Sequence, residues 1–178
     1  SICVFCGSSD NADKVYKDVA AMLGTEIARR GMTLVYGGGD VGTMGSLASA
    51  AMDAGGKVIG IIPRYLNERV QHLPLTELVV VEGMHERKAM MQERADSFVV
   101  LPGGIGTMEE FFEIWTWRYI GLHQKPIGLL NINGFYDVLI EFLHVMNEQG
   151  FLQTQVLNDL CIETSSTAML DTLTKSAT

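Results

Sequence analysis

Three short apolar runs in this chain each end in a glycine-rich turn and lead into a segment that favours a helix. The runs are Ile2 to Phe5, Thr33 to Tyr36 and Phe98 to Leu101. Strands that alternate with helices in this way form parallel sheets with helices on both faces. Ligands bind such sheets at the carboxyl ends of the strands, where all three turns are expected. The sequence therefore predicts a single α/β domain over residues 1–178, with a Rossmann-like doubly wound parallel sheet.

The rest of the chain continues this alternation. Apolar runs predict further strands at 57–62, 78–81, 127–131 and 160–162. Helical spacing and capping residues predict helices over 15–27, 44–54, 84–96, 107–120, 135–148 and 167–174. A polar connection is expected over residues 64–76.

The segment 107–120 has too many apolar residues for one buried stripe, so we expect this helix to bury two faces. The line expected on the sheet comprises Met108, Phe112, Trp115 and Tyr119. The line left for another helix or another subunit comprises Phe111, Ile114 and Trp117. The second face leads us to predict a homodimer.

The third glycine turn, Pro102 to Glu110, is typical of an anion-binding loop. Three glycines in four positions let the backbone approach a ligand, and the N–H groups at the start of the next helix attract phosphate. Glu110 lies one helical turn beyond Thr107, so its carboxylate is expected to face whatever the loop holds. The same spacing also fits a capping box between these two side chains. A cap does not explain the extra glycines, and the two interpretations are compatible.

The second glycine turn, Gly37-x-Gly39-x-x-Gly42, matches the dinucleotide-binding fingerprint and follows a predicted strand. That fingerprint also needs an acid about 20 residues further on. The next predicted strand is followed by Pro63 and Arg64 instead. We therefore favour a second turn lining the same cleft over a nicotinamide or flavin site. A purely structural turn is the remaining alternative.

The charged residues of the chain indicate which kinds of ligand the protein can bind. Arg87, Lys88 and Arg94 have no acid three or four residues away on their predicted helix, so the usual surface ion pairs are absent. These cations are available to serve something else, although a solvated surface arginine would give the same pattern. A net charge of −8 argues against a general nucleic-acid surface. A small anionic ligand needs only local positive charge.

No metal or cofactor site is visible in the sequence. Cys3 and Cys6 have C-x-x-C spacing, but they lie within or at the end of a strand, which favours buried thiols over a redox pair. No paired metal spacing links the cysteines with the histidines, which are His72, His85, His123 and His144. No apolar run approaches membrane-spanning length and no secretory pattern opens the chain, so we expect a cytoplasmic protein without a membrane partner.

Taken together, the motifs resemble those of the Lonely Guy (LOG) family of cytokinin-activating phosphoribohydrolases, whose bacterial members have been labelled possible lysine decarboxylases. The resemblance covers nearly the whole chain. It rests on Phe5-Cys6-Gly7-Ser8-Ser9, Tyr36-Gly37-Gly38-Gly39, Met84-His85-x-Arg87-Lys88, Pro102-Gly103-Gly104-x-Gly106-Thr107-x-x-Glu110 and Thr116-Trp117. The Met-His-x-Arg-Lys and Pro-Gly-Gly-x-Gly-Thr-x-x-Glu signatures are highly specific in combination.

This resemblance implies hydrolysis of the N-glycosidic bond in AMP or an N6-substituted AMP, giving the free base and ribose 5-phosphate. It implies that Arg87 and Glu110 are the essential catalytic pair. The expected substrate-binding residues are Gly7, Ser8, Gly39, Glu68, Lys88, Gly103, Gly104, Ile105, Gly106, Thr107, Met108, Glu109 and Thr116. The decarboxylase label has no mechanistic support, because no particular lysine stands out as the attachment point of a cofactor.

Chemistry supports this assignment independently. Cleavage of a ribosyl bond builds positive charge on the sugar, so a fixed carboxylate can stabilise the transition state or activate water. We expect Glu110 in the first helical turn, where about 0.3–1 kcal/mol favours its ionised form at neutral pH. Arg87 could hold the phosphate or ribose, or assist the leaving base. The alternative class is a nucleotide or molybdenum-cofactor carrier, which needs no acid facing the anomeric carbon.

Overall fold

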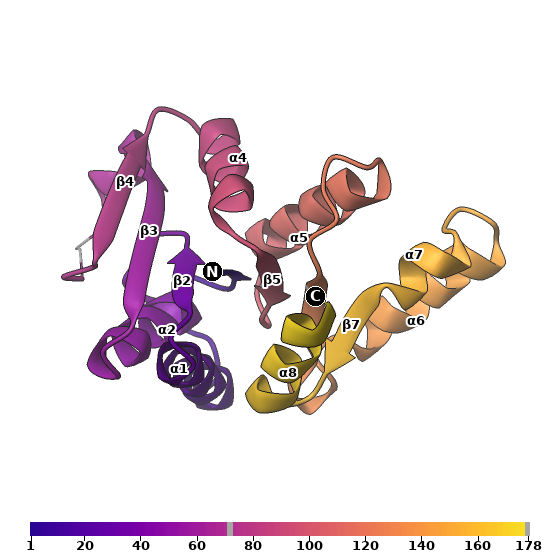
Figure 1. Cartoon of the computed structure of the whole chain (residues 1–178), viewed down its shortest axis with the longest axis horizontal. Coiled ribbons are helices and arrows are strands. Elements are labelled where there is room, and N and C mark those ends of the chain that lie inside the picture. The colour runs from indigo at the N-terminus through magenta and orange to yellow at the C-terminus, as the bar shows by residue number, and fades with distance from the viewer. Residues whose placement is uncertain (71–72, 177–178) are drawn as a thin grey trace.

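The sheet has the predicted doubly wound topology (Figure 1). A computed structural model describes residues 1–70 and 73–176. Its seven strands lie in the order β4-β3-β2-β1-β5-β6-β7, and every neighbouring pair is parallel. They are β1 (Ile2–Phe5), β2 (Thr33–Tyr36), β3 (Lys57–Pro63), β4 (Glu77–Val81), β5 (Ser97–Val100), β6 (Ile127–Leu130) and β7 (Leu160–Glu163). The strand order reverses between β1 and β5, and such a switch point leaves a crevice at the carboxyl ends of the strands.

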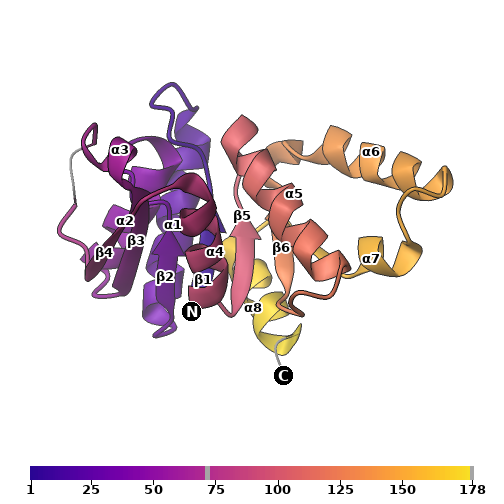
Figure 2. The same ribbon diagram turned by 90° about the horizontal axis from the view of Figure 1, so that it is seen from above.

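The helices cover both faces of this sheet. They are α1 (Lys14–Arg29), α2 (Gly42–Asp53), α3 (Arg64–Asn67), α4 (Met84–Arg94), α5 (Ile105–Tyr119), α6 (Asp137–Glu148), α7 (Thr154–Asn158) and α8 (Ser166–Ser176), with a 3-10 turn at Ile132–Gly134. Helices α1, α2 and α8 lie on one face and α4 and α5 on the other, while α6 and α7 extend beyond the sheet (Figures 1 and 2). The sequence did not predict α3 and α7, because four and five residues are too few to show a helical period.

Successive residues of β1 point to opposite faces and join separate halves of the core. Ile2 and Val4 belong to the cluster under α1 and α2, whereas Cys3 and Phe5 belong to the cluster under α4 and α5. Cys6 lies with the first cluster, so the two cysteines are buried free thiols in different halves of the core. Burial raises the pKa of Cys6 to about 12.

The predicted faces of α5 are only partly right, because Trp115 is buried as expected but Phe111 and Ile114, assigned to the other face, are buried with it. The side chains that the helix buries are Thr107, Glu110, Phe111, Ile114 and Trp115. Phe112 and Tyr119, expected on the sheet, are 36% and 53% exposed. Two apolar lines run along this helix, and apolar content alone could not show which one faces inward. The inward line also includes two polar residues that face a cavity.

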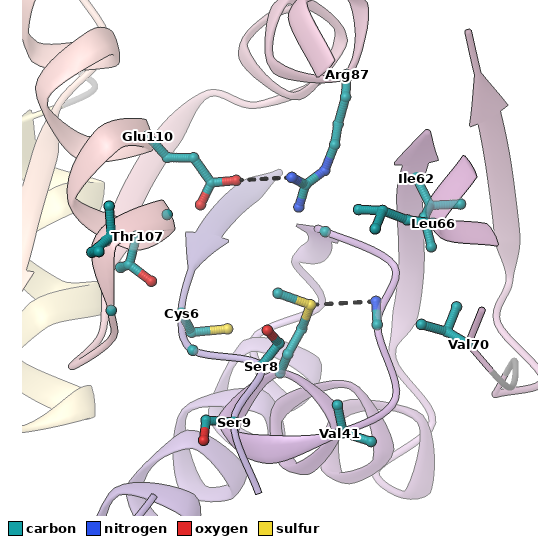
Figure 3. A pocket seen from close by; sticks show the side chains of 17 residues that line it. Cys6, Ser8, Ser9, Val41, Ile62, Leu66, Val70, Arg87, Thr107 and Glu110 are labelled. Atoms are coloured by element: carbon teal, nitrogen blue, oxygen red, sulfur yellow. Dashed lines mark hydrogen bonds and ion pairs between the residues drawn. The ribbon is translucent and has the colours of Figure 1, made fainter. Parts of the chain in front are cut away.

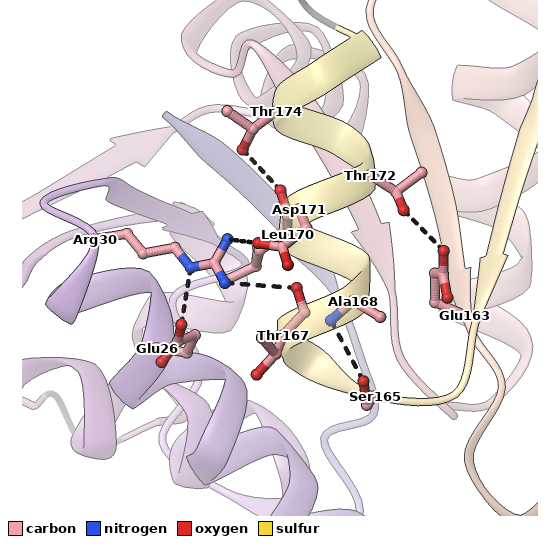
Figure 4. A network of polar contacts seen from close by, with 10 residues as sticks. All are labelled: Glu26, Arg30, Glu163, Ser165, Thr167, Ala168, Leu170, Asp171, Thr172 and Thr174. Carbon is pink, nitrogen blue, oxygen red and sulfur yellow. Dashed lines mark hydrogen bonds and ion pairs between the residues drawn. The ribbon is translucent and has the colours of Figure 1, made fainter.

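A polar network joins the C-terminal helix to α1 (Figure 4). Arg30 donates from Nε to Glu26 Oε1 at 2.8 Å and from Nη1 to Asp171 Oδ1 at 2.7 Å. These three residues, named here the Arg30 cluster, lie outside the cavities described below. Within residues 1–70 and 73–176, none of the helices has the length and apolar character needed to cross a membrane. A cytoplasmic location stays a prediction.

Candidate active site

A cavity of about 460 Å³ opens at the switch point of the sheet (Figure 3). The three glycine turns that follow β1, β2 and β5 contribute to its wall, as predicted, and residues of α2, β3, α3, the segment after α3, α4 and α5 complete it. Its lining residues are Cys6, Gly7, Ser8, Ser9, Gly37, Gly39, Val41, Met44, Ile62, Leu66, Val70, Arg87, Gly104, Ile105, Gly106, Thr107 and Glu110.

The start of α5 forms one wall of the cavity and can bind an anion. Gly104 is the N-cap and makes no side-chain capping bond, and the helix begins at Ile105. The first bond of the helix runs from Met108 N to Gly104 O at 3.1 Å. The N–H groups of residues 105–107 therefore have no partner within the helix and lie at the cavity, an arrangement that suits phosphate.

The predicted capping box is absent, because the helix starts before Thr107. Thr107 is the third helical residue and is buried. A glycine is needed at 103, since a Cβ there would overlap the Thr107 hydroxyl. The hydroxyl thus packs against the turn, while Glu110 lines the cavity.

Glu110 and Arg87 meet inside the cavity (Figure 3). Arg87 Nη1 lies 3.2 Å from Glu110 Oε1, and both residues are 8% exposed. Arg87 Nε donates to the carbonyl of Ile61 at 3.1 Å, which fixes the guanidinium at the end of β3. Gly37 makes room for it, because a Cβ at that position would overlap Nη2 of Arg87. Arg87 is therefore a buried, oriented cation, not a solvated surface arginine.

Burial raises the pKa of Glu110 to about 7, even though Arg87 opposes the rise. The sequence places Glu110 in the first helical turn, where the ionised form would be favoured, and that placement is wrong. Glu110 is the sixth residue of α5, beyond the reach of the favourable helix terminus. Desolvation is the larger effect, so this carboxyl group exchanges its proton near neutral pH. A perturbed acid in a cleft is typical of catalytic sites.

The wall opposite Thr107 is apolar. Ile62 from the end of β3 and Leu66 and Val70 from the α3 region lie across the cavity from the start of α5 (Figure 3). The cavity thus has an anion-binding end, an ion pair in the middle and an apolar end. This order matches the phosphate, sugar and base of a nucleotide.

Several predicted site residues lie elsewhere. Gly103 lines a smaller adjoining cavity of about 190 Å³. Glu68 and Thr116 are exposed and Met108 is half-buried. Lys88 contacts Glu109 and Glu113 of α5. The residues outside the lining of the larger cavity are Glu68, Lys88, Gly103, Met108, Glu109 and Thr116.

The three cations of α4 each have an acidic partner from another element. Arg94 pairs with Glu77 of β4 at 3.3 Å, and Arg87 and Lys88 pair with α5. Spacing along one helix could not reveal partners that are distant in sequence. In the part of the chain that the structure describes, no three His, Cys, Asp or Glu side chains are grouped to hold a metal ion. His72 lies outside the described residues.

Sequence reasoning missed part of the lining. The additional residues are Cys6, Ser9, Gly37, Val41, Met44, Ile62, Leu66 and Val70. Gly37 and Ile62 carried a usable signal, since they follow or end strands at the carboxyl edge of the sheet. Leu66 and Val70 carried none, because the short helix α3 was not predicted.

A family model described as possible lysine decarboxylase matches residues 44–173. The cytokinin riboside 5'-monophosphate phosphoribohydrolase LOG of Oryza sativa subsp. japonica is 49% identical over 152 residues, which are 85% of this chain and 63% of that protein. The cytokinin riboside 5'-monophosphate phosphoribohydrolase LOG1 of Arabidopsis thaliana is 47% identical over 85% of this chain and 71% of its own length. The chain thus spans a little less than two thirds of the rice relative.

The fold also matches solved structures at lower identity. The molybdenum cofactor binding protein of Rippkaea orientalis superposes with a TM-score of 0.76 at 24% identity, over 99% of this chain and 97% of that one. That identity supports a shared fold only. The family model and the plant relatives, in contrast, cover most of the chain at a much higher identity, and on their evidence it belongs to the LOG family.

Proposed function

We propose that this chain hydrolyses the N-glycosidic bond of AMP or of an N6-substituted AMP such as a cytokinin riboside 5'-monophosphate. The products are the free base and ribose 5-phosphate. The observation that carries the proposal is the buried Arg87–Glu110 pair, which lies in one cavity with the anion-binding start of α5. The activity names of the plant relatives support the same reaction.

The shape of the cavity suggests how the substrate lies. The phosphate accepts hydrogen bonds from the N–H groups of residues 105–107, and the base lies toward Ile62, Leu66 and Val70. The ribose then occupies the middle, beside Glu110. This arrangement places a carboxylate next to the anomeric carbon, where positive charge develops.

In the reaction, the bond between C1' and the base nitrogen breaks and its electron pair leaves with the base. The Glu110 carboxylate stabilises the positively charged sugar and accepts a proton from the water that attacks C1'. The departing base takes up a proton from solvent and leaves as the neutral base, and Glu110 returns its proton to solvent. Arg87 holds this carboxylate in place and favours its ionised form. The sequence leaves the role of Arg87 open. Its contacts with Glu110 and with the Ile61 carbonyl favour the role of holding the carboxylate.

The ionised carboxylate is the active form in this scheme, so kcat/KM should rise with pH through about 7, the pKa of Glu110. A pH series of initial rates with AMP measures the profile. A rate that falls with increasing pH across this range would mean that Glu110 works as an acid.

The carrier alternative rests on the likeness to the cofactor-binding protein of Rippkaea orientalis. That likeness supports a shared fold only. A carrier has no need for a buried acid with a pKa near neutrality beside the ligand. The decarboxylase description has less support. An enzyme that attaches its cofactor to a lysine needs that lysine in the cavity, and none of the described lining residues is a lysine.

Product analysis tests the proposal. The purified protein is incubated with AMP and with N6-isopentenyl AMP, and the products are separated by chromatography. Base release by the wild type establishes the reaction, and the ratio of the two rates shows which purine substituent is preferred. Binding of both nucleotides without base release would favour the carrier.

We further propose that the chain acts as a homodimer. Helix α6 and the residues before it expose an apolar stripe at helical spacing, formed by Phe135, Val138, Phe142 and Val145. Such a stripe is typical of a protein interface. Sedimentation equilibrium should give twice the chain mass, and Phe142→Lys should shift the protein toward the monomer. A monomeric wild type would contradict the proposal.

A further inference from the structure

The second glycine turn matches the dinucleotide-binding fingerprint, and the proposed reaction leaves this match unexplained. Helix α2 follows the turn, with Val41 as an N-cap that makes no side-chain capping bond. The first bond within the helix runs from Gly45 N to Val41 O at 3.0 Å. The N–H groups of residues 42–44 therefore need partners outside the helix. In a dinucleotide-binding protein, phosphate oxygens supply such partners.

In this chain, the first glycine turn, residues 7–10, supplies the partners. Gly42 N donates to Asp10 Oδ1 at 3.1 Å. The buried Thr43 hydroxyl donates to the Gly7 carbonyl at 2.8 Å, and the N–H group of the following residue donates to the same carbonyl at 3.0 Å. The turn is thus bound at both ends by three consecutive residues of α2. The Asp10 carboxylate takes the place at this helix start that a phosphate has in the fingerprint proteins.

The two turns also touch along their backbones. Gly42 has a φ of +65°, and a Cβ there would lie 2.8 Å from backbone atoms of Ser8 and Ser9. Only glycine fits both this conformation and this space. The third glycine of the fingerprint is therefore explained by contact with the first glycine turn, without a dinucleotide.

The first glycine turn also faces the end of the cavity that suits phosphate. Gly7, Ser8 and Ser9 line the cavity together with the start of α5 (Figure 3). A Cβ at Gly7 would lie 3.6 Å from Gly103 Cα, so the turn lies against the loop that precedes α5. A phosphate bound by the N–H groups of residues 105–107 would therefore lie beside this turn.

We propose that Asp10 and Thr43 are positioning residues, which hold the first glycine turn on the start of α2 and thereby place it against the substrate phosphate. The inference rests on the proposed function for the identity of the substrate. The second glycine turn then supports the phosphate site without binding phosphate itself.

Binding of inorganic phosphate, measured by isothermal titration calorimetry, tests this role without any turnover. In Asp10→Ala and in Thr43→Val, the first glycine turn has to be ordered when the anion binds, and this ordering weakens binding. Each variant should bind phosphate about 3- to 10-fold more weakly than the wild type, the scale of one hydrogen bond. KM for AMP should rise by a similar factor with kcat nearly unchanged, because the reacting groups are retained.

Two further variants separate positioning from other roles. Asp10→Asn keeps an oxygen acceptor for the N–H group of Gly42 and should bind phosphate nearly as well as the wild type. Ser165→Ala is the control, because Ser165 Oγ accepts from Ala168 N at 3.3 Å at the start of α8 and lines neither cavity described above. In urea denaturation it should lose about as much stability as Asp10→Ala, with unchanged phosphate affinity and KM.

Three results would overturn the proposal. Lower stability of Asp10→Ala and Thr43→Val with unchanged phosphate affinity and KM would mean that these contacts only hold the fold. Tighter phosphate binding in both Asp10 variants would mean that the carboxylate only repels the anion. A wild type that binds no phosphate would leave the turn without an anion to contact. If the expected phosphate affinities were found but AMP released no base, the hydrolase assignment would fail and the positioning role would stand.

Discussion

Two groups of cations and carboxylates in this protein have similar chemistry and different surroundings. In the Arg30 cluster, the arginine is 22% exposed and its partners, Glu26 and Asp171, are 27% and 53% exposed, at distances of 2.8 and 2.7 Å. In the cavity, the side chains of Arg87 and Glu110 are 9% and 8% exposed and their closest atoms are 3.2 Å apart. The more deeply buried pair thus has the looser contact.

Under the proposed function, this difference distinguishes an ion pair that stabilises the fold from one that serves the reaction. Exposed ion pairs contribute little, but they also cost little, because water still solvates the charges. Desolvation of the buried Glu110 carboxylate is only partly offset by Arg87 and Lys88, so its pKa rises to about 7. The Arg30 cluster joins two helices, and the Arg87–Glu110 pair keeps an acid ready to exchange a proton.

The largest expected effect comes from Glu110→Gln, which keeps the shape of the side chain and removes its charge. Turnover should fall by at least about 100-fold, the scale for loss of one preorganised electrostatic partner. Glu26→Gln in the Arg30 cluster is the matched control and should keep wild-type turnover. Initial rates of base release, with circular dichroism to verify folding, measure both. Near-normal turnover in Glu110→Gln would remove this residue from the chemistry.

A smaller loss is expected from Gly37→Ala. The new Cβ would overlap Nη2 of Arg87 and displace the guanidinium from Glu110, so kcat should fall by about 10- to 100-fold. Gly83→Ala is the control, because a Cβ there meets open space at the start of α4. Equal kinetics of the two alanine variants would show that the position of Arg87 is not critical.

Stability should reveal the cost of burying Glu110. Its pKa is about 7 in the folded chain and near 4.5 when unfolded, so the folded state binds more protons between these values and loses stability as the pH rises through them. Glu110→Gln cannot titrate and avoids this loss. From pH 4 to pH 8 its free energy of unfolding should gain roughly 3 kcal/mol relative to wild type, at about 1.4 kcal/mol per pKa unit.

Urea denaturation at a series of pH values measures this difference. Glu26→Gln again serves as the control for replacing a paired glutamate outside the cavity. If both variants followed the same pH dependence relative to wild type, the effect would not come from the burial of Glu110.

The smallest effect is expected from Arg30→Met. Its ion pairs are partly solvated, so their loss should lower the free energy of unfolding by about 1 kcal/mol. Turnover should not change, because the Arg30 cluster does not reach the cavity. Urea denaturation and initial rates check the two parts separately. A marked loss of turnover would mean that α8 influences the site and would weaken the contrast between the two groups.

Much of the fold could be predicted because local patterns determine it. The strands, the long helices and the three glycine turns follow from apolar runs and from residues that end helices, such as Gly31 with its φ of +67°. Helix α3 is too short to show a period, so Leu66 and Val70 could not be assigned to the site. The inward face of α5 could not be predicted, because two apolar lines run along this helix and only the fold determines which one meets the sheet.

The site was predictable in its chemistry and less so in its geometry. Glycine turns and the motif containing Glu110 indicated the anion-binding loop and the acid. Arg87 and Glu110 are 23 positions apart, and Lys88 is 21 and 25 positions from Glu109 and Glu113. Only the packing of α4 on α5 brings these residues together. The pKa of Glu110 was misjudged for the same reason, since burial depends on the complete fold.

The most direct test of the account is the stoichiometry of products from AMP, measured for the wild type and for Glu110→Gln at the same protein concentration. We predict that the wild type releases adenine and ribose 5-phosphate in equal amounts without inorganic phosphate, and that Glu110→Gln releases at least about 100-fold less of both. Inorganic phosphate as the main product, or equal release of adenine by the two proteins, would contradict the account.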